Sequence, residues 1–194
     1  MAEHENISVK TRYMEALFKL CELKPLNKVT VSDILRETGT ARQTFYNNFR
    51  DINDLISYVF IYHFEKNLDV FNTREGSLKS LEFAREHRAL FSQLPHHTGQ
   101  NCYRDTHMRT LKRGYYKLVF QTEEPPEDDP RKAFIDAYVY GCTDIFLEWC
   151  ASNMTSPPDE VVVDVYYGTR PDFLPPYVPL CTMTNEICLL YTSD

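Results

Sequence analysis

The stretch from Val29 to Arg50, VTVSDILRETGTARQTFYNNFR, constrains the fold of this chain most strongly. Val31, Ile34 and Leu35 have the i, i+3, i+4 spacing of one apolar stripe on a short helix. Two hydroxyl residues are candidates for its N-cap, Thr30 and Ser32. Gly39 can adopt the left-handed conformation that ends a helix and turns the chain sharply. The pattern predicts a short helix followed by a tight turn.

A second short helix is predicted from Ala41 to Asn48. Phe45 and Phe49 are four residues apart, so both can pack inward against the first helix. Two helices joined by a tight glycine turn form a helix-turn-helix. The outward face then carries polar side chains suited to base edges and phosphates: Arg42, Gln43, Thr44, Tyr46 and Asn47. A polar surface helix without a ligand is the alternative interpretation of the same composition.

At these residues the sequence resembles the TetR family of transcriptional regulators. The resemblance is carried by T-V-x-D-I at 30–34, Gly39, T-F-Y at 44–46, Phe49 and D-x-x-D-L at 51–55. It covers about the first 60 residues well. Two positions depart from the family pattern. Ile52 stands where many members have a phosphate-contacting lysine, and Gln43 stands where many have a small residue. The second departure implies a distinct operator preference.

The resemblance implies an all-α fold, in which an N-terminal three-helix DNA-binding domain precedes a helical ligand-binding and dimerisation domain. We expect the first domain in residues 1–50, the second in 51–163, and an irregular tail in 164–194. Base contacts are expected from Arg42, Gln43, Thr44 and Asn47, and phosphate contacts from Thr30, Tyr46 and Arg50. The implied partners are a double-stranded DNA operator, a second copy of the chain and a small-molecule effector of unknown identity.

The net charge of −7 is unusual for a DNA-binding protein, so its distribution matters. Residues 1–60 contain eight basic and eight acidic side chains, and the remaining residues contain 13 basic and 20 acidic. The whole net negative charge therefore lies outside the predicted DNA-binding domain. A neutral N-terminal domain on an acidic body predicts modest non-specific DNA affinity.

Amphipathic stripes predict helices through most of the body. The predicted segments are 7–23, 51–71, one or two helices within 78–95, 103–121 and 131–154. The acidic, proline-containing run 123–130 predicts a solvated loop. Gly141 in mid-helix suggests close approach of another helix. The family resemblance implies that the last two helices form a homodimer interface, with residues 138–149 as one half of it.

Aromatic side chains in the body could surround an apolar ligand. The four candidates for ligand contact are Tyr103, Tyr115, Tyr138 and Trp149. The alternative is that these rings simply belong to the core. The adjacent pair His96 and His97 is weak evidence for a metal because no further ligand lies at metal-binding spacing. No cofactor is expected, and no catalytic motif indicates an enzyme.

The remaining features concern compartment and the end of the chain. We expect a cytoplasmic protein because no apolar run is long enough to span a membrane and the N-terminus does not resemble a signal peptide. The six cysteines form no C-x-x-C pair and are expected to be buried thiols. From Gly168 onward no amphipathic helix is predicted, and the end from Cys188, CLLYTSD, resembles translated adapter sequence. A native irregular extension and a foreign end both fit this tail.

Two functional hypotheses follow. The first is a DNA-binding regulator, specifically a repressor that leaves a palindromic operator when an effector binds. The second is a TetR-like interaction or ligand-binding module, such as a coactivator partner, that does not bind an operator itself. The acidic body, Ile52 and the irregular tail motivate the second hypothesis.

Overall fold

The computed structural model describes residues 8–66, 74–99 and 101–161 of the chain. Every regular element in these ranges is a helix, which confirms the all-α fold. The N-terminal elements are α1 (Val9–Leu23), η1 (Leu26–Lys28), α2 (Val31–Thr38), α3 (Arg42–Tyr46) and α4 (Ile52–Lys66). They are followed by α5 (Arg74–Glu86), α6 (Arg88–Phe91), η2 (Leu94–His96), α7 (Tyr103–Phe120), α8 (Pro130–Ala151) and α9 (Pro158–Val161).

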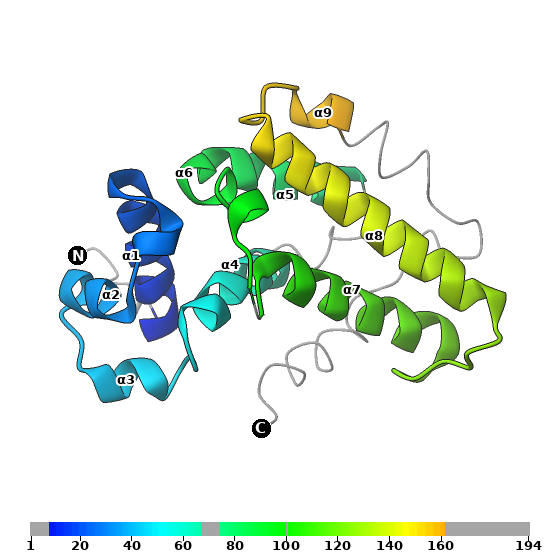
Figure 1. Cartoon of the computed structure of the whole chain (residues 1–194), viewed down its shortest axis with the longest axis horizontal. Coiled ribbons are helices and arrows are strands. Elements are labelled where there is room, and N and C mark those ends of the chain that lie inside the picture. The colour runs from blue at the N-terminus through cyan, green and yellow to red at the C-terminus, as the bar shows by residue number, and fades with distance from the viewer. Residues whose placement is uncertain (1–7, 67–73, 100, 162–194) are drawn as a thin grey trace, which may run out of the picture.

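Helix α1 is the support on which the N-terminal part is built. Its N-cap is Ser8, whose hydroxyl accepts a hydrogen bond from the backbone N–H of Thr11 at 3.1 Å. This satisfies one of the free N–H groups at the helix start. One face of α1 packs against α2 and α4, and it also contacts α6 of the body. Figure 1 shows α1, α2 and α3 grouped at one end of the molecule.

Helix α4 connects this group to the body. The Asp51 carboxylate accepts from the N–H of Asp54 at 2.9 Å, as expected for an acidic N-cap. The Asp54 carboxylate in turn accepts from the N–H of Arg50 at 3.0 Å, one residue before the position that a standard capping box would use. Helix α4 then packs against α1, α5 and α7. The predicted continuation of this helix to Phe71 lies outside the described residues.

The body is dominated by α7 and α8, which run side by side in opposite directions (Figure 1). The acidic run between them forms their connection, as predicted, and Asp129 caps α8 by accepting from the N–H of Arg131 at 3.0 Å. One predicted boundary is wrong. The helices predicted within 78–95 begin earlier than expected, because α5 starts at Arg74 and contains Gly76. Helix α9 begins at Pro158, and the predicted tail 164–194 lies outside the described residues.

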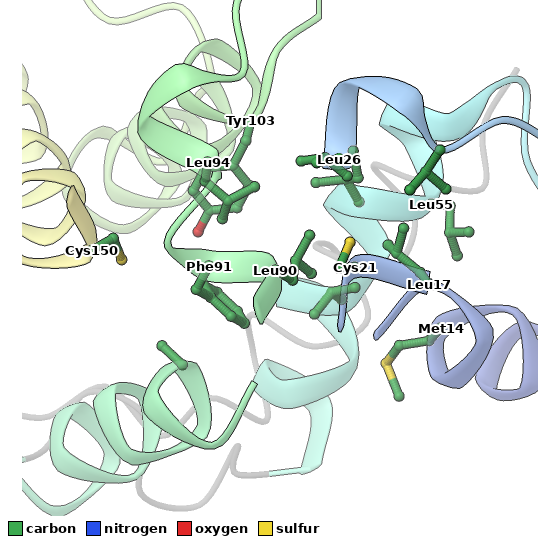
Figure 2. Packing of buried hydrophobic residues seen from close by; sticks show 14 of the residues in the cluster. Met14, Leu17, Cys21, Leu26, Leu55, Leu90, Phe91, Leu94, Tyr103 and Cys150 are labelled. Carbon is green, nitrogen blue, oxygen red and sulfur yellow. The ribbon is translucent and has the colours of Figure 1, made fainter. Parts of the chain in front are cut away.

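One continuous core joins the N-terminal group to the body. It runs from Leu17 of α1 through Leu90 and Phe91 of α6 to Cys150 of α8 (Figure 2). A smaller cluster lies between α7 and α8 and contains Met108, Tyr116, Ile135 and Val139. Because the core is shared, a shift of helices in the body would change the packing around α1. In the part of the chain that the structure describes, no helix is long and apolar enough to cross a membrane.

Candidate functional site

The start of α2 is fixed by a reciprocal capping box. Thr30 is the N-cap: its hydroxyl oxygen accepts from the N–H of Asp33 at 3.2 Å, and its own N–H donates to the Asp33 carboxylate at 2.9 Å. Of the two N-cap candidates, Thr30 is therefore the one used. Asp33 also pairs with Lys24 at 2.5 Å and with Arg36 at 2.6 Å. Hydrogen bonds from Lys24, the largest cause, and from Thr30 hold the pKa of the Asp33 carboxyl far below its usual range.

The turn after α2 is held from α1. Gly39 has φ 67° and occupies the left-handed region, as predicted for the residue that ends the helix. Tyr13 is fully buried and donates from its phenol to the hydroxyl of Thr40 at 2.9 Å. Tyr13 was missed at the sequence level, although its position four residues before Leu17 places it on the same stripe. Because Tyr13 bonds the turn, α1 fixes where α3 begins.

Helix α3 is anchored by two buried rings. Phe45 is fully buried and Phe49 is 4% exposed, which confirms both as inward residues. Their ring centroids lie 5.3 Å and 6.1 Å from that of Tyr13, in edge-on arrangements. The regular helix covers only Arg42 to Tyr46, so it is shorter than the predicted 41–48. These anchors leave the opposite face of α3 to solvent.

The predicted base-reading residues share that exposed face, with Thr44 half-buried beside it. Arg42 donates to the hydroxyl of Ser32 on α2 at 3.2 Å. Gln43 donates to the side-chain oxygen of Asn47 at 2.8 Å. Two amide groups that are already oriented toward each other can meet a base edge with little further ordering. Figure 1 shows α3 at the outer edge of the molecule.

The three predicted phosphate-binding residues differ in how far their side chains already interact with other residues of the chain. Tyr46 is 45% exposed and Arg50 is 86% exposed at its side chain, with its guanidinium 3.5 Å from Asp54. The hydroxyl of Thr30 instead donates to Asp33 at 2.7 Å. Lys10 lies over the rings of Phe49 and Tyr58, and Lys24 is paired with Asp33. Much of the basic charge near α3 is therefore held by partners in the same domain.

A cavity of about 50 Å³ lies between the helices of the body. Helices α4, α5, α6, α7 and α8 each contribute to its wall. Its lining residues are Phe60, His63, Ser80, Leu81, Phe83, Phe91, Tyr103, His107 and Phe146. Most of these side chains carry a ring, so the cavity presents ring faces and edges to whatever occupies it.

The cavity includes one of the four predicted ligand-contacting residues. Tyr103 lines it. Tyr115 and Tyr138 instead pack against each other, 5.7 Å between ring centroids, at the smaller cluster between α7 and α8. Trp149 is buried in the main core and donates from its indole nitrogen to the carbonyl of Ser156 at 2.9 Å. The structure therefore does not bring the four rings together around one space.

Two histidines of the cavity were missed at the sequence level. Burial lowers the pKa of His63 to about 4, helped by the nearby His87, and burial lowers the pKa of His107 to about 4. Both imidazoles are therefore uncharged at neutral pH. No local motif singles them out, because the cavity is assembled from helices far apart in the sequence. The pair considered for metal binding is not in the cavity wall, and His97 accepts from the N–H of Tyr103 at 3.3 Å.

Four rings, which we term the ring column, connect the cavity to α1. His63 stacks on Phe83 with 4.4 Å between centroids, and Phe83 meets His87 at 4.6 Å. His87 then stacks on Phe18 of α1 at 3.8 Å, with the two planes 9° apart. The column starts at cavity-lining residues and ends on the helix that supports the helix-turn-helix. A displacement of Phe83 would be transmitted to α1 through two direct ring contacts.

The cysteines in the described part of the chain are buried thiols, as expected. They are Cys21, Cys102, Cys142 and Cys150. Burial raises the pKa of Cys21 and of Cys150 to about 12, and that of Cys142 to about 11. Thiols with such pKa values contain almost no thiolate at neutral pH and are poor nucleophiles. They contribute to packing.

Comparison with known proteins agrees with this architecture. Residues 72–167 match a TetR family model described as "Transcriptional regulator C-terminal region". Among solved structures, the fold is similar to that of a protein named "Dihydroxyacetone kinase operon activator DhaS", with a TM-score of 0.57 and 17% sequence identity. That similarity covers 82% of this chain and 93% of the other. No curated protein is similar enough in sequence to match. The match assigns residues 72–167 to the C-terminal region of TetR family transcriptional regulators, and the solved structure has a similar all-α fold.

Proposed function

We propose that this regulator is a homodimeric repressor that binds a palindromic DNA operator through α3 and leaves it when an effector enters the body cavity. The observation that carries the proposal is the geometry of α3. Its apolar side is anchored by Phe45 and Phe49, and its opposite side presents Arg42, Gln43 and Asn47 to solvent. A helix held in this way can enter the major groove, where arginine and amide side chains distinguish base pairs.

Arg42→Ala tests the base-reading role. We expect the substitution to relax selectivity at one operator position and to cost about 1–3 kcal/mol of binding free energy. Its control is Arg50→Ala, because loss of a phosphate contact should weaken binding to all sequences about equally. The measurement is selection of bound DNA from a randomised library with each variant. Unchanged selectivity in Arg42→Ala would remove this residue from the base-reading set.

A second copy of the chain is proposed on the exposed face of α8. Phe134 is 59% exposed and Tyr140 is 42% exposed on this helix, and Ala137 and Gly141 are also exposed. A side-chain Cβ built on Gly141 would meet nothing within 4 Å, so no element of the described chain approaches it closely. Within residues 8–66, 74–99 and 101–161, the expected close approach of another helix is therefore not made. It would be supplied by the partner of a symmetric dimer, which also provides the second recognition helix about 34 Å away.

The ring column supports the proposed switch. A ligand can shift the protein between two arrangements only if it binds them with different affinity. A molecule larger than the cavity meets that condition, since it requires the lining rings to move. Phe83 both lines the cavity and contacts His87, which lies on Phe18 of α1. Ring movement at Phe83 would therefore favour a different position of the helix that supports α3.

A TetR-like partner protein without its own operator is the second candidate. It is favoured by the way basic side chains of the N-terminal domain are used: Lys24 and Arg36 pair with Asp33, and Lys19 pairs with Glu37. The dependence of binding on salt separates the candidates. DNA affinity that falls steeply between 50 and 200 mM salt indicates phosphate contacts, whereas no binding at 50 mM supports the partner role. The similar solved structure is named an operon activator, so activation is the alternative sign of regulation.

A further inference from the structure

The chemistry of the cavity restricts its ligand beyond what the family match implies. None of the lining residues that the structure describes is Asp, Glu, Lys or Arg. Its two imidazoles are uncharged at neutral pH, because burial holds the pKa of each near 4. Protonating either one to balance an anion would cost binding free energy, because burial disfavours the charged imidazole. The wall therefore favours an uncharged ligand over a carboxylate or an ammonium ion.

One polar group in this wall is available for a ligand. The Nδ1 atom of His107 lies 3.4 Å from the phenol oxygen of Tyr103. Within the described part of the chain the second ring nitrogen, Nε2, makes no hydrogen bond. A neutral imidazole has one donor and one acceptor nitrogen, and which of them is Nε2 depends on the tautomer. A hydroxyl group matches either tautomer because it both donates and accepts.

The rings around His107 indicate a flat ligand. Phe60 meets the imidazole edge-on at 4.5 Å between centroids, and Tyr103 stacks on it at 5.2 Å. Phe146 lies further away, at 6.5 Å. Aromatic rings favour such offset and edge-on neighbours, and a further ring can continue the arrangement. An aliphatic chain would fill the same space without these contacts.

The size of the cavity sets a further condition on the ligand. Its volume of about 50 Å³ is about one third of the ~150 Å³ cavity that holds benzene in an engineered protein. A ring therefore enters only if a lining side chain moves. Phe83 is only partly buried and is part of the ring column, so its rotation would both widen the cavity and disturb the contact with His87.

We propose that the cavity binds an uncharged molecule of about one aromatic ring that carries a single hydroxyl group, with His107 as its hydrogen-bond partner. This inference rests on the proposal that the cavity is the effector site. It assigns His107 the recognition of the polar group and assigns the phenylalanine rings the recognition of the flat body. Ser80 also lines the wall with a polar side chain, so its substitution provides a comparison for the substitution of His107.

The test is direct binding of three probes to the full-length protein at pH 7.5, with each affinity measured by calorimetry. Phenol and toluene have similar shapes and differ in the hydroxyl, and benzoate adds a negative charge. We expect phenol to bind about tenfold more tightly than toluene, and benzoate at least a hundredfold more weakly than phenol. His107→Phe keeps a ring in place and should lower phenol affinity to the toluene level, with toluene affinity unchanged within threefold. Ser80→Ala should leave the phenol preference intact.

Several outcomes would overturn the inference. Equal affinity for phenol and toluene, or a phenol preference that survives His107→Phe, would remove His107 as the partner. Tighter binding of benzoate would show that the cavity takes anions. No binding of phenol or toluene would exclude the proposed ligand class. DNA is absent from these titrations, so each result is independent of whether α3 binds an operator.

Discussion

Replacing Phe45 with alanine is expected to destabilise the protein by about 3–5 kcal/mol, the usual cost of removing a fully buried phenylalanine. Phe45 is 0% exposed and lies 5.3 Å from Tyr13 and 5.8 Å from Phe49 between ring centroids. Helix α3 has only five residues, and so short a helix is not stable without packing. Loss of the ring should therefore release α3 and abolish operator binding with it.

The control for Phe45→Ala is the adjacent residue. Tyr46 is 45% exposed, so Tyr46→Ala should change stability by no more than about 0.5 kcal/mol. Both variants are compared with the wild type by urea unfolding followed by circular dichroism. Amide hydrogen exchange over residues 30–50 identifies the part that opens. If the two substitutions shift the unfolding midpoint equally, Phe45 does not anchor α3.

Replacing Asp33 with asparagine is expected to cost about 1.5–3 kcal/mol at pH 7, the range found for hydrogen bonds to charged groups. Asparagine has nearly the same shape but cannot pair with Lys24 or Arg36, which lie 2.5 Å and 2.6 Å from the carboxylate. The Asp33 side chain is 11% exposed, so water replaces these partners poorly. Glu37→Gln is the control because its pair with Lys19 is more exposed and should contribute at most ~1 kcal/mol.

The effect of Asp33→Asn should depend on pH with a definite sign. The folded-state pKa of Asp33 lies far below the unfolded value of about 3.9. A lowered carboxyl pKa contributes stability that is complete above the unfolded pKa and is lost as pH falls toward the folded pKa. The stability difference between wild type and Asp33→Asn should therefore be smaller at pH 3 than at pH 7 in urea unfolding. A difference that stays constant or grows on acidification would show that the ion pairs do not stabilise the fold.

The helix-turn-helix could be predicted because its signals are local. Thr30 caps α2, Gly39 takes the left-handed conformation, and Phe45 is buried, and each of these follows from residues within a few positions. The contribution of Tyr13 is different, since its partner Thr40 is 27 residues away. Sequence spacing indicates that Tyr13 faces inward but not which turn it contacts.

The cavity could not be predicted in the same way. Its wall combines residues from five helices, and His63 and His107 have no motif around them. Large aromatic residues were the available signal, and that signal found Tyr103 but equally selected Tyr115 and Tyr138, which pack between α7 and α8. Ring content alone does not distinguish a cavity wall from a filled core.

Helix α8 shows the same difficulty. Apolar residues occur on several of its faces, with Val139 and Phe146 buried and Phe134 and Tyr140 exposed. Periodicity therefore identified the helix but not the side that faces the chain's own core. The open space at Gly141 depends on where the other helices lie, so only the tertiary structure could reveal it.

The most direct test of the central claim is selection of DNA from a random library by the purified full-length protein, with the mass in solution determined on the same sample. The account predicts a palindromic site, half-sites separated by one helical turn, and the mass of a dimer. A protein that selects no sequence at 50 mM salt, whatever its mass, would contradict the account and leave the partner-protein role in its place.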